Sequence, residues 1–209
     1  MDNVSFSPSL FWEFPKFDSI QLLMSQIPSV TLEDTFEAMV RLHKEGYRPV
    51  ALDFASASNP GGGWRKGQQG TQEESLCKRS NLGELLETRK YPLAPNTVLY
   101  VPGVKLKPPL GTSMPTCAVI ASELHAIAAS SQQYLLGRVE SLYHEAQRHG
   151  HDAIVLGAWG CGAFRETEED AEILAKIFKT IAKRYPNIKP VYAMCRPGRN
   201  YQCFLRILN

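Results

Sequence analysis

Two adjacent carboxylates stand at the end of a glycine-rich stretch of the chain, where they could take part in proton transfer. Glu73 and Glu74 follow residues 59–70 and open a segment of helical character. A carboxyl group can give or take a proton, but Thr71 and Glu74 also have the spacing of a helix capping box, and spacing alone favours capping. Adjacent helical residues point about 100° apart, so the pair does not fit the opposed acid and nucleophile of a typical glycosidase. If chemistry takes place here, we expect one glutamate to perform it and the other to hold the ligand.

Three consecutive glycines precede these carboxylates. Gly61, Gly62 and Gly63 lie between an expected strand and an expected helix, which is where open α/β sheets bind ligands. Glycine lets a backbone approach a ligand closely and adopt positive φ angles. The triplet, with Gly67 and Gly70 shortly after it, therefore favours a ligand cradle over a simple flexible turn.

A second glycine-rich loop follows a later strand. It consists of Gly157, Ala158, Trp159, Gly160, Cys161, Gly162, Ala163 and Phe164. A strand-to-helix turn of this kind offers backbone N–H groups and a helix N-terminus to phosphate, although it is neither a P-loop nor a dinucleotide fingerprint. Cys161 as a nucleophile is the less favoured alternative, because no histidine lies in the same loop to activate it. Two such loops on one sheet edge predict a ligand that contains a diphosphate.

The elements that must position these loops alternate between strand and helix. Apolar runs predict strands at residues 50–54, 97–101, 117–121, 153–156, 191–195 and 203–207. Helical spacing and capping patterns predict helices from a cap at residues 31–34 to Gly46, over 71–90, over 133–150, and from a cap at residues 167–170, while the prolines of residues 102–116 predict an irregular loop. This alternation indicates an α/β fold with a mixed, mostly parallel sheet.

The domain organisation expected from length is simple. The chain has 209 residues, which favours a single domain, 1–209. Residues 1–49 form an aromatic-rich N-terminal segment and a helix, and 50–209 form the core. The aromatic segment could cover an edge of the core or present an interaction surface; we favour the first, because so much aromatic surface seldom stays exposed.

Composition excludes several classes of protein. The 23 basic and 21 acidic residues give a net charge of +2, which argues against strong nucleic-acid binding. No apolar run reaches the ~20 residues of a membrane span and no secretion signal is evident, so we expect no membrane association and a cytoplasmic, soluble protein. The five cysteines include no CxxC pair, and neither they nor His144, His149 and His151 form a convincing metal site. No metal and no cofactor is expected, and composition gives no oligomeric state.

At the two loops the sequence resembles a known family. The pattern GGG-x8-QEE, formed by Gly61–Gly63 and Gln72, Glu73 and Glu74, is similar to the signature of poly(ADP-ribose) glycohydrolases. The segments 52–63, 72–77 and 155–164 resemble the microbial-type branch of that family, and the similarity runs from about residue 50 to residue 195. The resemblance implies a macrodomain-like three-layer α/β/α sandwich that holds ADP-ribose in a cleft across the edge of its sheet.

The resemblance also implies a role for each matched residue. Glu74 would be the catalytic acid, Glu73 would bind ribose hydroxyls, and Gln72 would help to fix the loop. Asn59 would contact the distal ribose, and Phe164 would pack near the terminal ribose. The two glycine-rich loops, from Gly61 to Gly63 and from Gly157 to Ala163, would hold the diphosphate.

The implied activity is hydrolysis of the ribose–ribose O-glycosidic bond of poly(ADP-ribose), which releases ADP-ribose. Departure of an alkoxide needs a proton, which Glu74 could supply before its carboxylate activates water. Two alternatives stay open: removal of single ADP-ribose units from a protein, a nucleic acid or a small molecule, and binding of ADP-ribose without turnover.

Overall fold

The computed structural model describes residues 29–162, 167 and 169–208, and they are organised around one sheet of six strands. The strands are β1 (Ser29–Thr31), β2 (Pro49–Phe54), β3 (Leu99–Lys105), β4 (Thr116–Ser122), β5 (Ala153–Leu156) and β6 (Lys189–Ala193). Their order is β1-β6-β5-β2-β4-β3, and only the edge strand β3 runs antiparallel to its neighbour. The expected α/β fold with a mixed, mostly parallel sheet is confirmed. The carboxyl ends of β2, β4, β5 and β6 consequently meet at the same edge.

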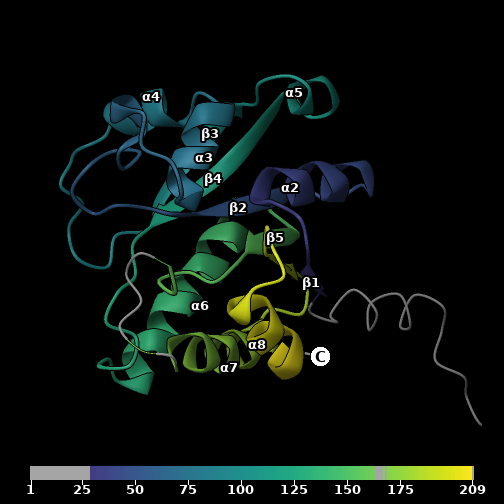
Figure 1. The fold of residues 1–209 in the computed structure, drawn as a ribbon. Coiled ribbons are helices and arrows are strands. Elements are labelled where there is room, and N and C mark those ends of the chain that lie inside the picture. Colours follow the sequence, from purple (N-terminus) through teal and green to yellow (C-terminus); the bar gives the residue numbers. More distant parts are fainter. Residues whose placement is uncertain (1–28, 163–166, 168, 209) are drawn as a thin grey trace, which may run out of the picture.

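Helices cover both faces of the sheet (Figure 1). On one side lie α2 (Thr35–Lys44), α3 (Gln72–Arg79) and α4 (Leu82–Glu87); on the other lie α6 (Gln132–Arg148), α7 (Asp170–Ala182) and α8 (Arg199–Leu208). The alternation of β2 explains the two cores, because Ala51 packs with the first set and Leu52 with the second. The described helices include none that is long and apolar enough to cross a membrane.

Two helices begin later than the sequence patterns predict. Asp34, not Thr31, is the N-cap of α2. Its carboxylate accepts from the N–H groups of Phe36 and Glu37, and the Glu37 carboxylate accepts from the backbone N–H of Asp34. Helix α7 begins at Asp170, and the Thr167 hydroxyl donates to the Asp170 carboxylate at 2.7 Å. In both cases the Thr-x-x-Asp pattern predicts a cap that begins at the threonine, whereas the aspartate stands at the start of the helix.

The helix expected over residues 71–90 is divided into α3 and α4. Ser80 adopts an extended conformation, its hydroxyl donates to the carbonyl of Leu76 at 2.7 Å, and its oxygen accepts from the N–H of Leu82 at 3.0 Å. A serine that bonds nearby backbone groups competes with the helical hydrogen-bond pattern.

The expected loop at 102–116 is also partly wrong. There β3 continues past Pro102, with an irregular register between Val101 and Val104, and the short helix α5 (Leu110–Ser113) follows.

The strand expected at residues 203–207 is a helix. In α8 the buried residues Phe204 and Leu208 are four positions apart, which places them on one helical face. Short apolar runs are ambiguous between strand and helix, and this one has the helical period.

The sequence pattern also missed β1, which pairs with β6. The sandwich thus includes β1 and α2, ahead of the core start expected at residue 50, and the aromatic residues of 1–28 lie outside the described part of the chain.

Candidate active site

A cleft of about 1300 Å³ opens where the parallel strands β2, β5 and β6 end. Most of its lining comes from three segments: the loop after β2 together with α3, the loop after β5, and the connection from β6 to α8. Asp34 and Thr35 at the start of α2 also contribute. Of the residues expected to bind substrate, it is lined by Asn59, Gly62, Gly63, Gln72, Glu73, Glu74, Ala158, Gly160 and Gly162. The structure therefore brings the two glycine-rich loops together at one site.

Gln72 fastens the start of α3 to the central strand. Its Oε1 accepts from the N–H of Phe54 at 2.9 Å, and its Nε2 donates to the carbonyl of Leu52 at 2.7 Å and to the Thr35 hydroxyl at 3.1 Å. Because the amide bonds the strand on both sides of residue 53, it fixes the height of α3 over β2. This geometry fits the loop-fixing role expected of Gln72.

The two glutamates are buried and accept hydrogen bonds from the backbone of the glycine-rich loop. The N–H of Ser56 donates to Glu73 Oε2 at 2.9 Å, and the N–H of Gly63 donates to Glu74 Oε1 at 3.2 Å. Only half of the expected capping box forms, because the Thr71 hydroxyl accepts from the N–H of Glu74 while the Glu74 side chain turns to Gly63. Glu73 Oε1 and Glu74 Oε2 have no hydrogen-bond partner among the described residues. Each carboxyl thus has one oxygen bonded to the loop and one buried oxygen without a hydrogen-bond partner among the described residues.

Burial alters the protonation of this region. It raises the pKa of Glu73 from 4.5 to about 7, against the opposing effect of the N–H groups of Ser56 and Gly61 and with a further contribution from the charge of Glu74. Asp53, which lies on β2 and is fully buried, also has a pKa raised well above its ordinary value, first by burial and then by the charge of Glu73. Near neutral pH, Glu73 can therefore exchange a proton.

The glycine triplet is shaped by its own neighbours. Gly62 has a φ of +61°, and a Cβ there would lie 3.1 Å from Glu73 Oε2. A Cβ on Gly61 would lie 2.3 Å from the ring of Trp64, and one on Gly63 would lie 1.7 Å from the side chain of Gln68. The backbone of Asn59 also takes part, since its carbonyl accepts from the N–H of Gly62 at 3.0 Å. The triplet thus lets the loop close over Glu73 and Glu74.

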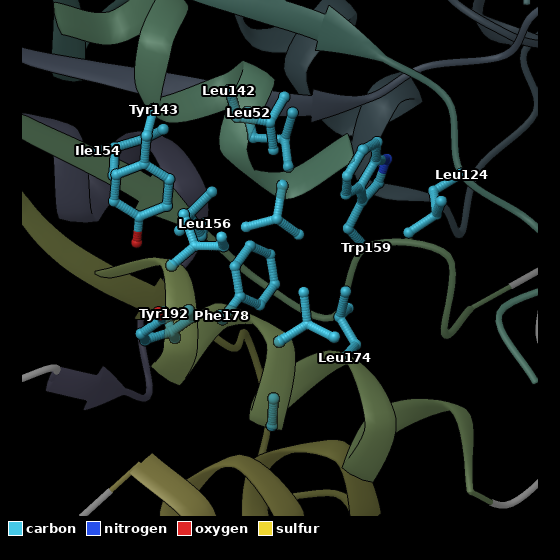
Figure 2. Close-up of a cluster of buried hydrophobic side chains, with 14 of the residues drawn as sticks. Leu52, Leu124, Leu142, Tyr143, Ile154, Leu156, Trp159, Leu174, Phe178 and Tyr192 are labelled. Atoms are coloured by element: carbon cyan, nitrogen blue, oxygen red, sulfur yellow. The ribbon is translucent and has the colours of Figure 1, made fainter. Parts of the chain in front are cut away.

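The second loop is anchored in the core by Trp159. Its ring is fully buried and its Nε1 donates to the carbonyl of Ser122 at 2.9 Å; Figure 2 shows it in the same apolar cluster as Leu52 and Leu124. The side chain of Trp159 therefore belongs to the core and does not line the cleft, so any contact of Trp159 with the diphosphate would come from its backbone. Cys161 is buried too, with its thiol 3.6 Å from the carbonyl of Trp159.

The glycines of this loop have different tasks. A Cβ on Gly157 would lie 2.8 Å from the ring of Phe54, and one on Gly160, which has a φ of +76°, would lie 2.8 Å from the carbonyl of Leu124. An added Cβ on Gly162 would have no atom of the described residues within 4 Å. Gly157 and Gly160 are thus required by packing, whereas Gly162 borders open space in the cleft. The expected contacts of Ala163 and Phe164 lie outside the described residues.

The third wall was not predicted. It runs from the end of β6 into α8 and includes Met194, Cys195, Arg196, Gly198, Arg199, Asn200 and Tyr201. The Nδ2 of Asn200 donates to the carbonyl of Cys161 at 3.2 Å and so joins this wall to the second loop. The signal available in the sequence was position, because these residues follow a strand of the same parallel sheet.

The described residues contain no group of three or more His, Cys, Asp or Glu side chains that could hold a metal ion. Two of the histidines considered as ligands contact Tyr100 instead. The ring of His149 stacks on it with the centroids 3.6 Å apart, and His151 Nε2 lies 2.9 Å from its hydroxyl.

Comparison with known proteins identifies the relatives of this chain. A family model described as the catalytic domain of microbial-type PARG, or poly(ADP-ribose) glycohydrolase, matches residues 8–106, which include the glycine triplet and both glutamates. The chain is similar to the microbial-type poly(ADP-ribose) glycohydrolases. Among curated proteins, no significant match is found.

Solved glycohydrolase structures extend the similarity beyond that segment. The poly(ADP-ribose) glycohydrolase from Thermomonospora curvata bound to the inhibitor ADP-HPD is 28% identical, with a TM-score of 0.70 over 90% of this chain and 82% of that chain. The glycohydrolase from Deinococcus radiodurans in complex with ADP-ribose is 25% identical, with a TM-score of 0.65 over 94% of this chain and 93% of that chain. The resemblance to poly(ADP-ribose) glycohydrolases is thereby confirmed in sequence and in fold.

Proposed function

We propose that this chain is an enzyme that hydrolyses the ribose–ribose O-glycosidic bond of poly(ADP-ribose) and releases ADP-ribose. The observation that carries the proposal is the pair of buried glutamates at the cleft, each with one oxygen bonded to the glycine-rich loop and one without a protein partner. A module that only binds ADP-ribose would have no need of a second carboxyl held in this way. The relatives of known structure support the proposal, since their bound ligands are ADP-ribose and ADP-HPD.

In the mechanism we propose, the two glutamates divide the work. Protonated Glu74 gives its proton to the departing ribose oxygen while the anomeric carbon develops positive charge. The resulting carboxylate then takes a proton from a water molecule, and the oxygen of that water bonds to the anomeric carbon. Glu73 accepts hydrogen bonds from ribose hydroxyls and holds the ring in place. The bond broken is thus replaced by one to water, and Glu74 ends protonated as it began.

The remaining contacts follow from the walls of the cleft. The loop after β5, through the backbone of Ala158, Gly160 and Gly162, is proposed to hold the diphosphate, and Asn59 is proposed to contact the distal ribose. A strand-to-helix turn suits an anion because backbone N–H groups point out of it. The segment from Met194 to Tyr201 borders the same cleft and is available to the adenosine part of the ligand.

The test is a release assay with two substrates, run in parallel with a binding titration. The chain is incubated with poly(ADP-ribose) on an automodified protein, with a mono-ADP-ribosylated protein, and with free ADP-ribose in a calorimeter. We expect free ADP-ribose from the polymer, measured by mass spectrometry. Release from the mono-modified protein alone would instead indicate a mono-ADP-ribosylhydrolase, and binding without release would indicate a reader.

Several wider expectations stay predictions. These are the organisation of residues 1–209 as a single domain, the cytoplasmic location, the weak affinity for nucleic acid, and the covering role of the aromatic N-terminal segment. Fractionation of cells that produce the chain and a truncation that begins at residue 29 would test the location and the role of the segment.

A further inference from the structure

A buried positive charge lies behind the cleft on helix α6. Arg138 occupies the buried face of this helix between Leu135 and Leu142, and it is 4% exposed. Burial lowers the pKa of its guanidinium, but arginine stays protonated in proteins. An ionised group in such a place is expensive unless its environment compensates it, so it calls for an explanation.

The partners of Arg138 are mostly backbone groups. Its Nη1 donates to the carbonyl of Asn96 at 2.8 Å, and its Nη2 donates to the Ser122 hydroxyl at 2.8 Å and to the carbonyl of Glu123 at 2.7 Å. The carboxylate of Glu123 contacts His125 Nδ1 at 2.8 Å instead. Arg138 is thus hydrogen-bonded to uncharged oxygens before β3, at the end of β4 and directly after it, and the charge of Glu123 also favours its ionised form.

Ser122 is hydrogen-bonded to residues at the bases of both glycine-rich loops. Its carbonyl oxygen accepts from the N–H of Ala55 at 3.1 Å and from Trp159 Nε1 at 2.9 Å. Ala55 precedes Ser56, whose N–H binds Glu73, and Trp159 anchors the loop after β5. The guanidinium carbon of Arg138 also lies 5.4 Å from the centre of the Trp159 ring, within the range of a cation–π contact. One carbonyl oxygen therefore joins the bases of the two loops. The hydroxyl of the same residue accepts from the Arg138 guanidinium at 2.8 Å and donates to the carbonyl of Thr97 at 2.7 Å.

We infer that Arg138 is a positioning residue for the ADP-ribose cleft. It holds Ser122 so that the two loops keep their spacing, and its charge adds to the attraction of the cleft for a diphosphate. The inference rests on the proposed function, since it takes ADP-ribose as the ligand. It assigns to α6 a part in binding that the lining of the cleft does not reveal.

Two substitutions separate geometry from charge. Arg138→Lys keeps the charge but loses the planar fork that reaches three oxygens, and Arg138→Met loses both. Arg148→Met is the matched control, because Arg148 is on the same helix with an exposed side chain that pairs with Glu145. The full chain is titrated calorimetrically with ADP-ribose at low and high salt, and its melting temperature and release kinetics are measured alongside.

We expect a graded result. Arg138→Lys should bind ADP-ribose about tenfold more weakly with the salt dependence of the parent, and Arg138→Met about a hundredfold more weakly with a smaller salt dependence. Arg148→Met should match the parent. In release kinetics the loss should fall mainly on KM, because Arg138 touches none of the reacting atoms.

Parental affinity in folded Arg138→Lys and Arg138→Met, with only the melting temperature lowered, would overturn the inference and leave Arg138 as a core residue. If neither variant folds, Ser122→Ala decides the matter, since it removes the hydroxyl that bonds Arg138 and the carbonyl of Thr97 and keeps the carbonyl oxygen that joins the loops. We expect it to bind several-fold more weakly, and parental affinity there would overturn the inference. A parent chain that does not bind ADP-ribose would instead contradict the proposed function itself.

Discussion

The first glycine-rich loop of the cleft is held by side chains that line the same cleft, whereas the second is held from behind by the core. Glu73 and Glu74 bond the loop after β2 through Ser56 and Gly63. The loop after β5 depends on Trp159, which is buried and bonded to Ser122. The two loops are thus both rich in glycine but are stabilised by different contacts. In the first, the supporting groups are also the groups proposed for chemistry; in the second, support and ligand contact fall on different residues.

Substitution in the first loop should have the largest effect on turnover. We expect Glu74→Gln to lower the release rate by about 10²- to 10⁴-fold, because glutamine keeps the hydrogen bond to Gly63 but cannot give or take the proton. ADP-ribose affinity should stay within about tenfold of the parent. Rates from mass spectrometry and affinities from calorimetry give both numbers, with the exposed Glu84→Gln on α4 as the control. A near-parental rate would move the acid role to Glu73, whose raised pKa suits it.

The same loop should show a pH dependence that the second lacks. If ribose hydroxyls donate to ionised Glu73, affinity for ADP-ribose should rise about tenfold from pH 6 to pH 8, because the pKa of Glu73 is about 7. Ionisation of a buried carboxyl that has a raised pKa opposes folding, so the free energy of unfolding should fall as the pH rises from about 4.5 to about 7.

Glu73→Gln checks both trends. It should bind about 10- to 100-fold more weakly, with an affinity and a melting temperature that vary less with pH than those of the parent. Calorimetry and thermal melts across pH 5 to 8 are the measurements. A variant that keeps the full pH dependence of the parent would assign it to another group, such as the buried Asp53.

In the second loop, two neighbouring glycines should give opposite results. Gly162→Ala should weaken ADP-ribose binding by about tenfold with little change in melting temperature, because the new methyl meets no atom of the described residues within 4 Å but would border the proposed ligand. Gly160→Ala should lower the free energy of unfolding by ~1–3 kcal/mol. Alanine would have to adopt the positive φ of this position, and its methyl would lie 2.8 Å from the carbonyl oxygen of Leu124. Unchanged affinity in Gly162→Ala would contradict the proposal that this loop binds the diphosphate.

The smallest effect is expected at Cys161. Its thiol is buried behind the cleft lining, so Cys161→Ala should release ADP-ribose within about threefold of the parental rate and lose only ~1 kcal/mol of stability. A loss as large as that of Glu74→Gln would make this cysteine a participant in the reaction and the second loop a catalytic one.

Sequence patterns predicted the sheet better than the ends of the helices. The strands at Val50 and Ala153 were found because a strand buried on both faces is a continuous apolar run. The start of α2 was misplaced because Thr31 and Asp34 both suit a cap, and only the backbone geometry selects Asp34. In α8, the spacing of Phe204 and Leu208 was hidden in a run too short to separate helix from strand.

For the site, the sequence located the two loops but not the orientation of their side chains. Trp159 stands between ligand-facing residues, and nothing local shows that its ring turns into the core. The wall from Met194 to Tyr201 joins the cleft only because β6 lies beside β5 in the sheet. Strand order is a tertiary property, so this wall could not be derived from the spacing of residues along the chain.

The shared carbonyl oxygen of Ser122 has a consequence for the speed of binding. Because both loops are bonded at their bases to this one oxygen, we expect the spacing between them to need no rearrangement when a ligand binds. Association with a preorganised cleft is limited by diffusion and orientation rather than by a slow closing step. We therefore expect stopped-flow traces of ADP-ribose binding to be single-exponential, with an observed rate that rises linearly with ligand concentration and does not level off.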